Sequence, residues 1–104
     1  MMEKIVNKFL NGYIGDKIDC RLIQTSKGFW YHLRGKSGVK FYTFRISKKH
    51  GGYTVFKDQD LCNMVASIFD ISTEDSGNLI SKWFQETFNI VKFSDLSQFI
   101  DKKG

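Results

Sequence analysis

Residues 29–46, FWYHLRGKSGVKFYTFRI, restrict the possible folds more than any other stretch of the chain. Two runs rich in aromatic and β-branched residues flank Gly35-Lys36-Ser37-Gly38, a pattern typical of a β-hairpin. Closing that hairpin with a two-residue turn opposes Tyr31 to Tyr42 and Trp30 to Thr43. Because side chains alternate between the two faces of a strand, the residues sort into two sets. The predicted core face holds Phe29, Tyr31, Leu33, Tyr42, Phe44 and Ile46, and the opposite face holds Trp30, His32, Arg34, Phe41, Thr43 and Arg45.

The segments before and after the hairpin predict one further helix and two further strands. Apolar residues at helical spacing predict a helix over about residues 2–11, ending at Asn11-Gly12. Residues 18–25 and 53–56 are rich in strand-forming types and are bounded by turn-forming residues. They are expected to add further strands to an antiparallel sheet.

The residue pattern of the C-terminal half predicts helices. Asp58 or Asp60 is expected to cap a first helix, and Ser72 is positioned to cap a second. An extended segment at 90–93 separates these from a last helix that begins at Ser94. Each helix has an apolar stripe that needs a partner, and the core face of the hairpin offers one.

These elements predict a single compact α+β domain over residues 1–104. It has an N-terminal helix, a three- to four-stranded antiparallel sheet around the central hairpin 29–46, and two to three C-terminal helices packed on one sheet face. The element order resembles that of integrase arm-binding domains and of double-stranded-RNA-binding domains. The resemblance covers element order alone, and residues 57–60, KDQD, lack the basic cluster that opens the second helix of RNA-binding domains.

The charge of the chain is unevenly distributed. Residues 1–57 hold twelve Lys/Arg and three Asp/Glu, a net +9, whereas residues 58–104 hold four and eight, a net −4. A basic half attracts polyanions. Lysine greatly outnumbers arginine and proline is absent, usage that follows AT-rich codons and suggests an AT-rich bacterium or its phage.

No apolar run approaches the ~20 residues that span a bilayer, and no signal peptide is apparent, so we expect a cytoplasmic protein (in the host cytoplasm if phage-encoded) with no membrane partner. The isolated pair Cys20 and Cys62 is expected to be two buried free thiols in a reducing compartment.

Motifs for catalysis, cofactors and metals were sought, and none is predicted. Gly35-Lys36-Ser37 resembles the end of a phosphate-binding loop, but Trp30 occupies the position of the required first glycine. The cysteines and histidines lack the close spacing of zinc ligands. One enzymatic alternative stays open, in which His32 beside two arginines serves in acid–base cleavage of RNA.

The preferred interpretation is a small non-enzymatic protein that binds nucleic acid, with cations contacting phosphates and rings stacking on bases. Two alternatives stay open: a modulator or inhibitor that binds a host or cellular protein, and a basic side that only confers solubility while the N-terminal helix covers Trp30 and Phe41. Oligomeric state stays open as well. The predicted nucleic-acid-binding residues are Arg21, Trp30, His32, Arg34, Lys36, Phe41, Arg45, Lys48 and Lys49.

Overall fold

A computed structural model of the protein describes residues 2–14, 21–25, 28–35, 38, 40–49 and 52–89, with the backbone alone at 21–25, 28, 29, 48 and 49. One helix, four strands and two helices follow in order, which confirms the predicted α+β class. Residues 18–20, the predicted extended segment 90–93 and the helix predicted from Ser94 lie outside the described residues. The elements are α1 (Met2–Tyr13), β1 (Arg21–Thr25), β2 (Gly28–Leu33), β3 (Tyr42–Lys49), β4 (Gly52–Phe56), α2 (Gln59–Phe69) and α3 (Thr73–Thr87).

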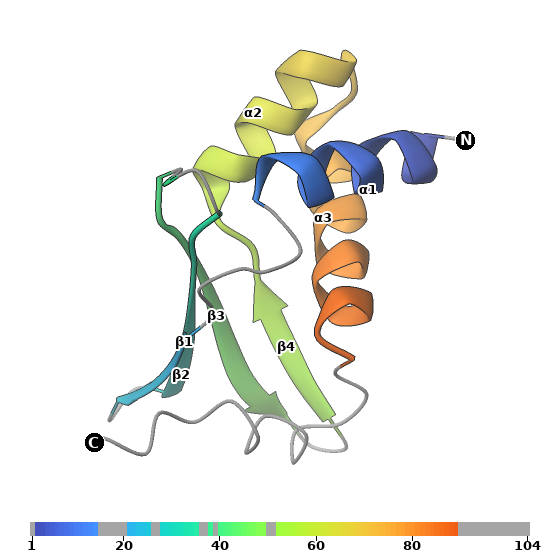
Figure 1. The fold of residues 1–104 in the computed structure, drawn as a ribbon. Coiled ribbons are helices and arrows are strands. Elements are labelled where there is room, and N and C mark those ends of the chain that lie inside the picture. Colours follow the sequence, from blue (N-terminus) through green and yellow to red (C-terminus); the bar gives the residue numbers. More distant parts are fainter. Residues whose placement is uncertain are drawn as a thin grey trace.

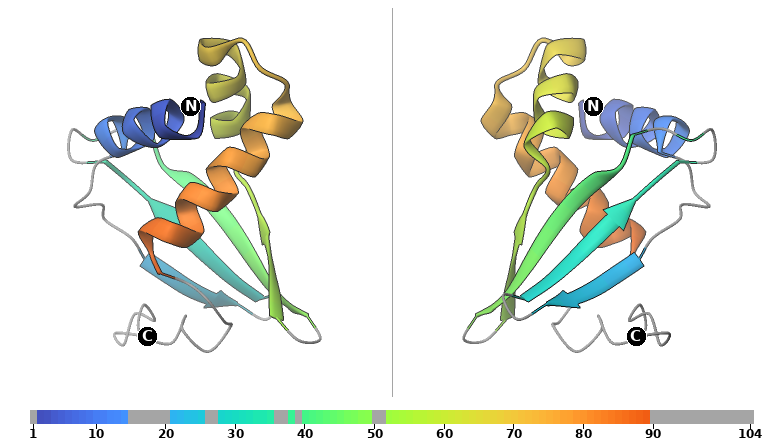
Figure 2. Two further views of the ribbon diagram at one scale, coloured as in Figure 1. Left: turned by 90° about the vertical axis from the view of Figure 1, so that its right-hand side faces the viewer. Right: turned by 90° about the vertical axis from the view of Figure 1, so that its left-hand side faces the viewer.

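The strands form one antiparallel sheet in the order β1-β2-β3-β4, so each strand lies beside its neighbour in the sequence. Helix α3 crosses one face of this sheet, and α1 and α2 pack with α3 at one end of the sheet on the same side (Figure 1). The right-hand view of Figure 2 shows the opposite face, and no described helix lies in front of it. The prediction that the helices share one sheet face is therefore confirmed.

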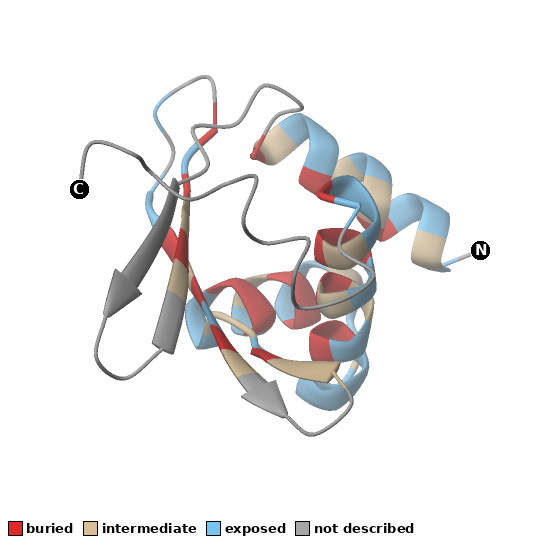
Figure 3. Cartoon of the chain, turned by 90° about the horizontal axis from the view of Figure 1, so that it is seen from below, coloured by how far each residue is buried: buried red, intermediate tan, exposed pale blue. Residues whose placement is uncertain are grey.

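The inner face of the sheet and the helices bury a single aromatic core. The ring of Phe84 from α3 stacks on Phe44 of β3, with centroids 4.5 Å apart, and meets Tyr31 of β2 edge-on at 5.0 Å. Such pairs add about 0.5–1.5 kcal/mol beyond the burial of their area. Figure 3 shows the buried positions, in red, gathered where helices and sheet meet. Five of the six predicted core-face residues are buried, namely Tyr31, Leu33, Tyr42, Phe44 and Ile46, and the side chain of Phe29 is outside the described part.

Helix α1 packs on the core side and does not cover the opposite face. Its Val6 and Leu10 are fully buried in the shared core. The indole Nε1 of Trp83 in α3 donates a hydrogen bond of 2.8 Å to Asn11 Oδ1. Near the other end of α1, Glu3 forms an ion pair with Lys82 at 3.0 Å. The alternative in which α1 covers Trp30 and Phe41 is therefore wrong.

The register of the hairpin differs from the predicted one by two residues. Leu33 pairs with Tyr42 and Trp30 pairs with Arg45, so the strands separate before the tight turn that the glycines suggested. A turn does form there, since Gly38 N donates to Gly35 O at 3.2 Å and Gly38 has φ +75°. Where the strands have parted, Gly35 packs against the end of α1, and a Cβ there would lie only 2.4 Å from the carbonyl oxygen of Ile14. A shift of two residues keeps every side chain on its predicted face.

Asp58 connects the sheet to α2. Its Oδ1 accepts hydrogen bonds from the N–H groups of Asp60 and Leu61, at 2.9 and 3.2 Å, which makes it the N-cap of the helix. Its Oδ2 accepts a bond of 2.8 Å from Thr43 N in β3. In α3 the cap is Ser72, whose Oγ accepts from Asp75 N at 3.0 Å. Both predicted caps are confirmed. The Asp58 carboxylate also accepts the Thr43 N–H just beyond Arg45 and Phe56, the last residue pair of β3 and β4 at this end.

Candidate functional site

The sheet face opposite the helices carries exposed rings and guanidinium groups. We call this set, formed by Trp30, His32, Arg34, Phe41, Thr43, Arg45 and Phe56, the open face. The alternation of strand side chains places the five strand residues outward, because the residues between them are buried in the core. Arg34 and Phe41 lie just beyond the ends of β2 and β3, and both are exposed. Trp30, His32 and Thr43 are half-buried, and the other four are exposed.

The middle of the open face is a row across three strands. Trp30 of β2 pairs with Arg45 of β3, and Arg45 pairs with Phe56 of β4. The Arg45 guanidinium carbon lies 4.7 Å from the centroid of the Trp30 ring, a cation–π contact. A hollow of about 290 Å³ lies in this row, lined by Trp30, Arg45, Ile46, Ser47 and Phe56. The side chain of Phe56 is 51% exposed beside it.

A second stack of the same type lies at the end of the sheet where β2 and β3 separate. The Arg34 guanidinium carbon is 3.9 Å from the centroid of the Phe41 ring, and the His32 ring meets the same phenyl ring edge-on at 5.8 Å. Phe41 is 42% exposed. These three side chains therefore form one cluster just beyond the last residue pair of β2 and β3.

The two arginines of the open face keep their charges available. Among the described residues, no carboxylate forms an ion pair with Arg34 or Arg45. Lys40 differs, because its ammonium group hydrogen-bonds the carboxylate of Asp60, and this bond raises the lysine pKa. The positive charge of the open face therefore resides mainly in its guanidinium groups, which are suited to bidentate recognition of phosphate.

The structure gathers five of the nine predicted binding residues into the open face: Trp30, His32, Arg34, Phe41 and Arg45. The backbone of Arg21 pairs with His32, and those of Lys48 and Lys49 pair with Tyr53 and Gly52. The side chains of these three residues, and Lys36 as a whole, lie outside the described part. The assignment of all nine to a binding site stays a prediction.

Phe56 lies on the open face but is not among the predicted binding residues. Residues 53–56, YTVF, indicate that Phe56 points outward, because its strand neighbour Val55 is buried and successive side chains point to opposite faces. Only the pairing of β4 with β3 shows that Phe56 lies next to Arg45.

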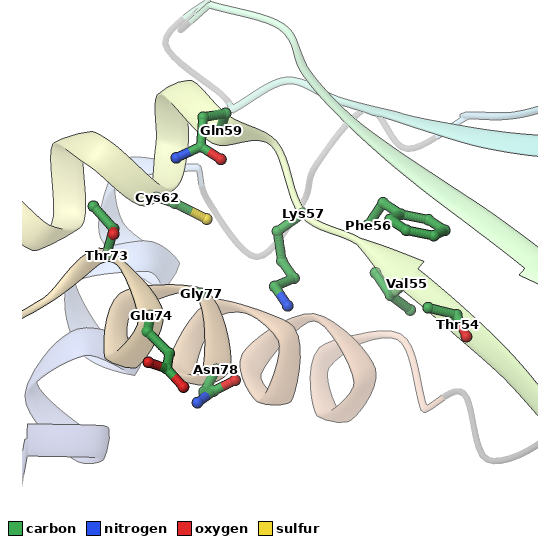
Figure 4. A pocket seen from close by; sticks show the side chains of 10 residues that line it. All are labelled: Thr54, Val55, Phe56, Lys57, Gln59, Cys62, Thr73, Glu74, Gly77 and Asn78. Atoms are coloured by element: carbon green, nitrogen blue, oxygen red, sulfur yellow. The ribbon is translucent and has the colours of Figure 1, made fainter.

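A separate hollow of about 480 Å³ lies between the end of β4 and the first turns of α2 and α3 (Figure 4). Lys57 points from the end of β4 to Gly77 of α3, where an added Cβ would lie 3.2 Å from the lysine Cε. Cys62 and Glu74 also line it. Burial raises the pKa of the Cys62 thiol, which keeps it protonated and a poor nucleophile. This hollow is therefore a weaker candidate than the open face.

The described residues supply little for catalysis or metal binding. They contain no group of three or more His, Cys, Asp or Glu side chains that could hold a metal ion. None of the described helices is long and apolar enough to cross a bilayer. Within the described part, His32 contacts the Phe41 ring and forms no ion pair with a carboxylate. RNA cleavage by His32 gains no positive observation from this geometry.

Comparison with protein-family models, with curated proteins and with solved structures found no match to this chain.

Proposed function

We propose that the protein binds nucleic acid through the open face. The observation that carries this proposal is the pair of arginine-on-ring stacks, Arg45 on Trp30 and Arg34 on Phe41, on a sheet face without a described helix. Guanidinium groups contact phosphates, and exposed rings stack on bases. The net charge of +9 over residues 1–57 adds long-range attraction to a polyanion.

Stacking on a ring prepares each arginine for this role. The contact with the ring holds the guanidinium plane in place, while the N–H groups at its edge stay able to donate to a phosphate. Less side-chain entropy is lost on binding than for a lysine, whose ammonium group moves freely in water. The two stacks lie at different levels of the sheet, so together they fix the direction of a bound backbone.

Salt dependence tests this proposal. Affinity for mixed-sequence DNA and RNA probes should fall linearly when log affinity is plotted against log salt concentration. The variant Arg34→Ala/Arg45→Ala should weaken binding and flatten the slope by about 1.4–1.8, since each phosphate contact contributes about 0.7–0.9. Fluorescence anisotropy across a salt titration measures both quantities.

The control removes the same charge from elsewhere. Lys4 and Lys8 are exposed on α1, so Lys4→Ala/Lys8→Ala changes the net charge equally without touching the open face. We expect this variant to retain nearly all of the slope. Equal losses in both variants would show that net charge, and not the open face, determines binding. Absence of binding to every probe at low salt would refute the proposal.

A second candidate is recognition of a host or cellular protein. The observation that favours it is the exposure of two phenyl rings on one face, 42% for Phe41 and 51% for Phe56. Exposed aromatic residues next to arginine are typical of interface hot spots. This candidate predicts one stoichiometric protein partner that survives nuclease treatment and is lost with Phe41→Ala/Phe56→Ala.

A further inference from the structure

We infer that the ligand of the open face is an unpaired strand, and that one of its bases occupies the hollow between Trp30 and Phe56. The inference rests on the proposed function and adds the class of nucleic acid and the position of a contact. Four features carry it: the spacing of the two rings, the width of the sheet, the exposure of Phe56 and the position of Arg45.

The spacing of the rings fits a flat group between them. Trp30 and Phe56 lie in one cross-strand row, two strands apart, so about 10 Å separates their backbones. Paired rings have centroids about 4.5–7 Å apart, so a base with a ring on each side needs about 9–14 Å between those two rings, a range that includes the separation of the backbones. Both rings line the same hollow of about 290 Å³. A base inserted there would contact a ring on each side.

The width of the sheet argues against a duplex. Neighbouring strands lie about 4.8 Å apart, so the outer two backbones of four strands are about 14 Å apart before side chains are counted. The major groove of B-form DNA is about 12 Å wide and the minor groove about 6 Å. An undistorted duplex on the open face would present phosphates and groove edges to the rings, because the faces of its bases are covered by their neighbours, and a ring could reach a base face only by unstacking a base step at a cost of a few kcal/mol. An unpaired base offers its face to Phe56 without that cost.

Arg45 is positioned to contact the phosphate of the nucleotide whose base occupies the hollow. Arg45 lies between the two rings in the row, stacks on Trp30 and is exposed. A base that enters the hollow would replace the Arg45 guanidinium on Trp30, and the released guanidinium would donate to the phosphate, so that only Arg34 keeps its ring contact in the complex. The ring and the cation then contact the two parts of one nucleotide, and the remaining stack of Arg34 on Phe41 is available to a neighbouring one.

The experiment compares a mixed-sequence single strand of about 16 nucleotides with the duplex formed from it and its complement, at one salt concentration. The single strand should bind at least about tenfold more tightly than the duplex. Phe56→Leu keeps an apolar side chain and removes the flat ring. It should weaken single-strand binding by about 5- to 150-fold, the effect of losing one stacked base, while leaving the salt slope unchanged.

Two controls accompany this comparison. Ile68→Ala removes a similarly exposed apolar side chain, 52% exposed on α2, and should change neither affinity. Trp30→Phe replaces the fluorescent indole at the other wall of the hollow, so the fluorescence quenching caused by base stacking on Trp30 should disappear. The remaining Trp83 is only 2% exposed and reports no contact with the strand.

The outcomes separate this inference from the proposed function. Equal affinity for duplex and single strand, with no effect of Phe56→Leu, would overturn the inference while salt-dependent binding through Arg34 and Arg45 persisted. No binding of either probe would overturn both. Both the inference and the proposed function are supported if the single strand binds more tightly than the duplex and if this binding is weakened by Phe56→Leu but not by Ile68→Ala.

Discussion

Replacing Asp58 with alanine tests how the end of the sheet is held against α2. The carboxylate accepts two helix N–H groups through Oδ1 and Thr43 N through Oδ2. Loss of an N-cap costs about 1 kcal/mol, and loss of a hydrogen bond to a charged acceptor about 1.5–3 kcal/mol. Because Asp58 is only half-buried, water replaces part of what is lost. We expect Asp58→Ala to lower the free energy of unfolding by about 2–3 kcal/mol.

Asparagine at the same position separates the two contributions. It caps helices as well as aspartate does, but it has a single acceptor oxygen, and its amide N–H₂ cannot accept the bond from Thr43 N. Asp58→Asn should therefore lose about half as much as Asp58→Ala. Ser72→Ala is the matched control, since Ser72 caps α3 through one bond and contacts no strand. It should cost about 1 kcal/mol.

Urea denaturation followed by circular dichroism measures all three variants. With a slope of about 1–3 kcal/mol per molar urea, a loss of about 2–3 kcal/mol should shift the midpoint of Asp58→Ala by about 0.7–3 M. A loss in Asp58→Ala no larger than that in Ser72→Ala would refute the reasoning, because the bond to Thr43 would then contribute nothing. Phe56 lies two residues before Asp58, so weaker binding of the single strand should accompany the loss of stability.

Two further predictions concern the turn and the thiol. Gly35→Ala should lower the free energy of unfolding by about 1–3 kcal/mol, because its Cβ would meet Ile14 O, whereas Gly12→Ala in open space on α1 should raise it by about 0.5–1 kcal/mol. Urea denaturation compares the two, and equal effects would contradict the proposed contact. Iodoacetamide should alkylate Cys62 more slowly in the native protein than in urea, since burial raises its pKa and leaves less thiolate at pH 8. Peptide mass mapping follows that position, and a native rate equal to the unfolded rate would show that the thiol is accessible.

The alternation of residues 29–46 was sufficient to predict which face of the sheet is buried. Burial of Tyr31 and Phe44 follows from a period of two, which needs no knowledge of the loop. The register was not predictable in the same way, because Gly35 and Ile14 are brought together by the packing of α1 on the core. The side of the sheet on which α1 packs was not predictable either, because the hydrogen bond from Trp83 to Asn11 joins residues 72 positions apart in the sequence.

The open face was predictable only in part. Arg45 was expected on it, but the predicted register placed Thr43 and not Arg45 opposite Trp30. Phe56 required the pairing of a five-residue strand whose partner could not be assigned from residue types alone. Local sequence therefore determined which side chains face outward, and contacts distant in the sequence determined which of them are neighbours.

The two-residue shift of the hairpin has a consequence for how sequence changes alter this surface. Both registers keep the same side chains on the buried face, so the alternation of apolar residues does not distinguish them. They differ on the open face, where one places Trp30 beside Thr43 and the other beside Arg45. A change of register would therefore rearrange the rings and cations of the open face while the same residues stayed on the buried side.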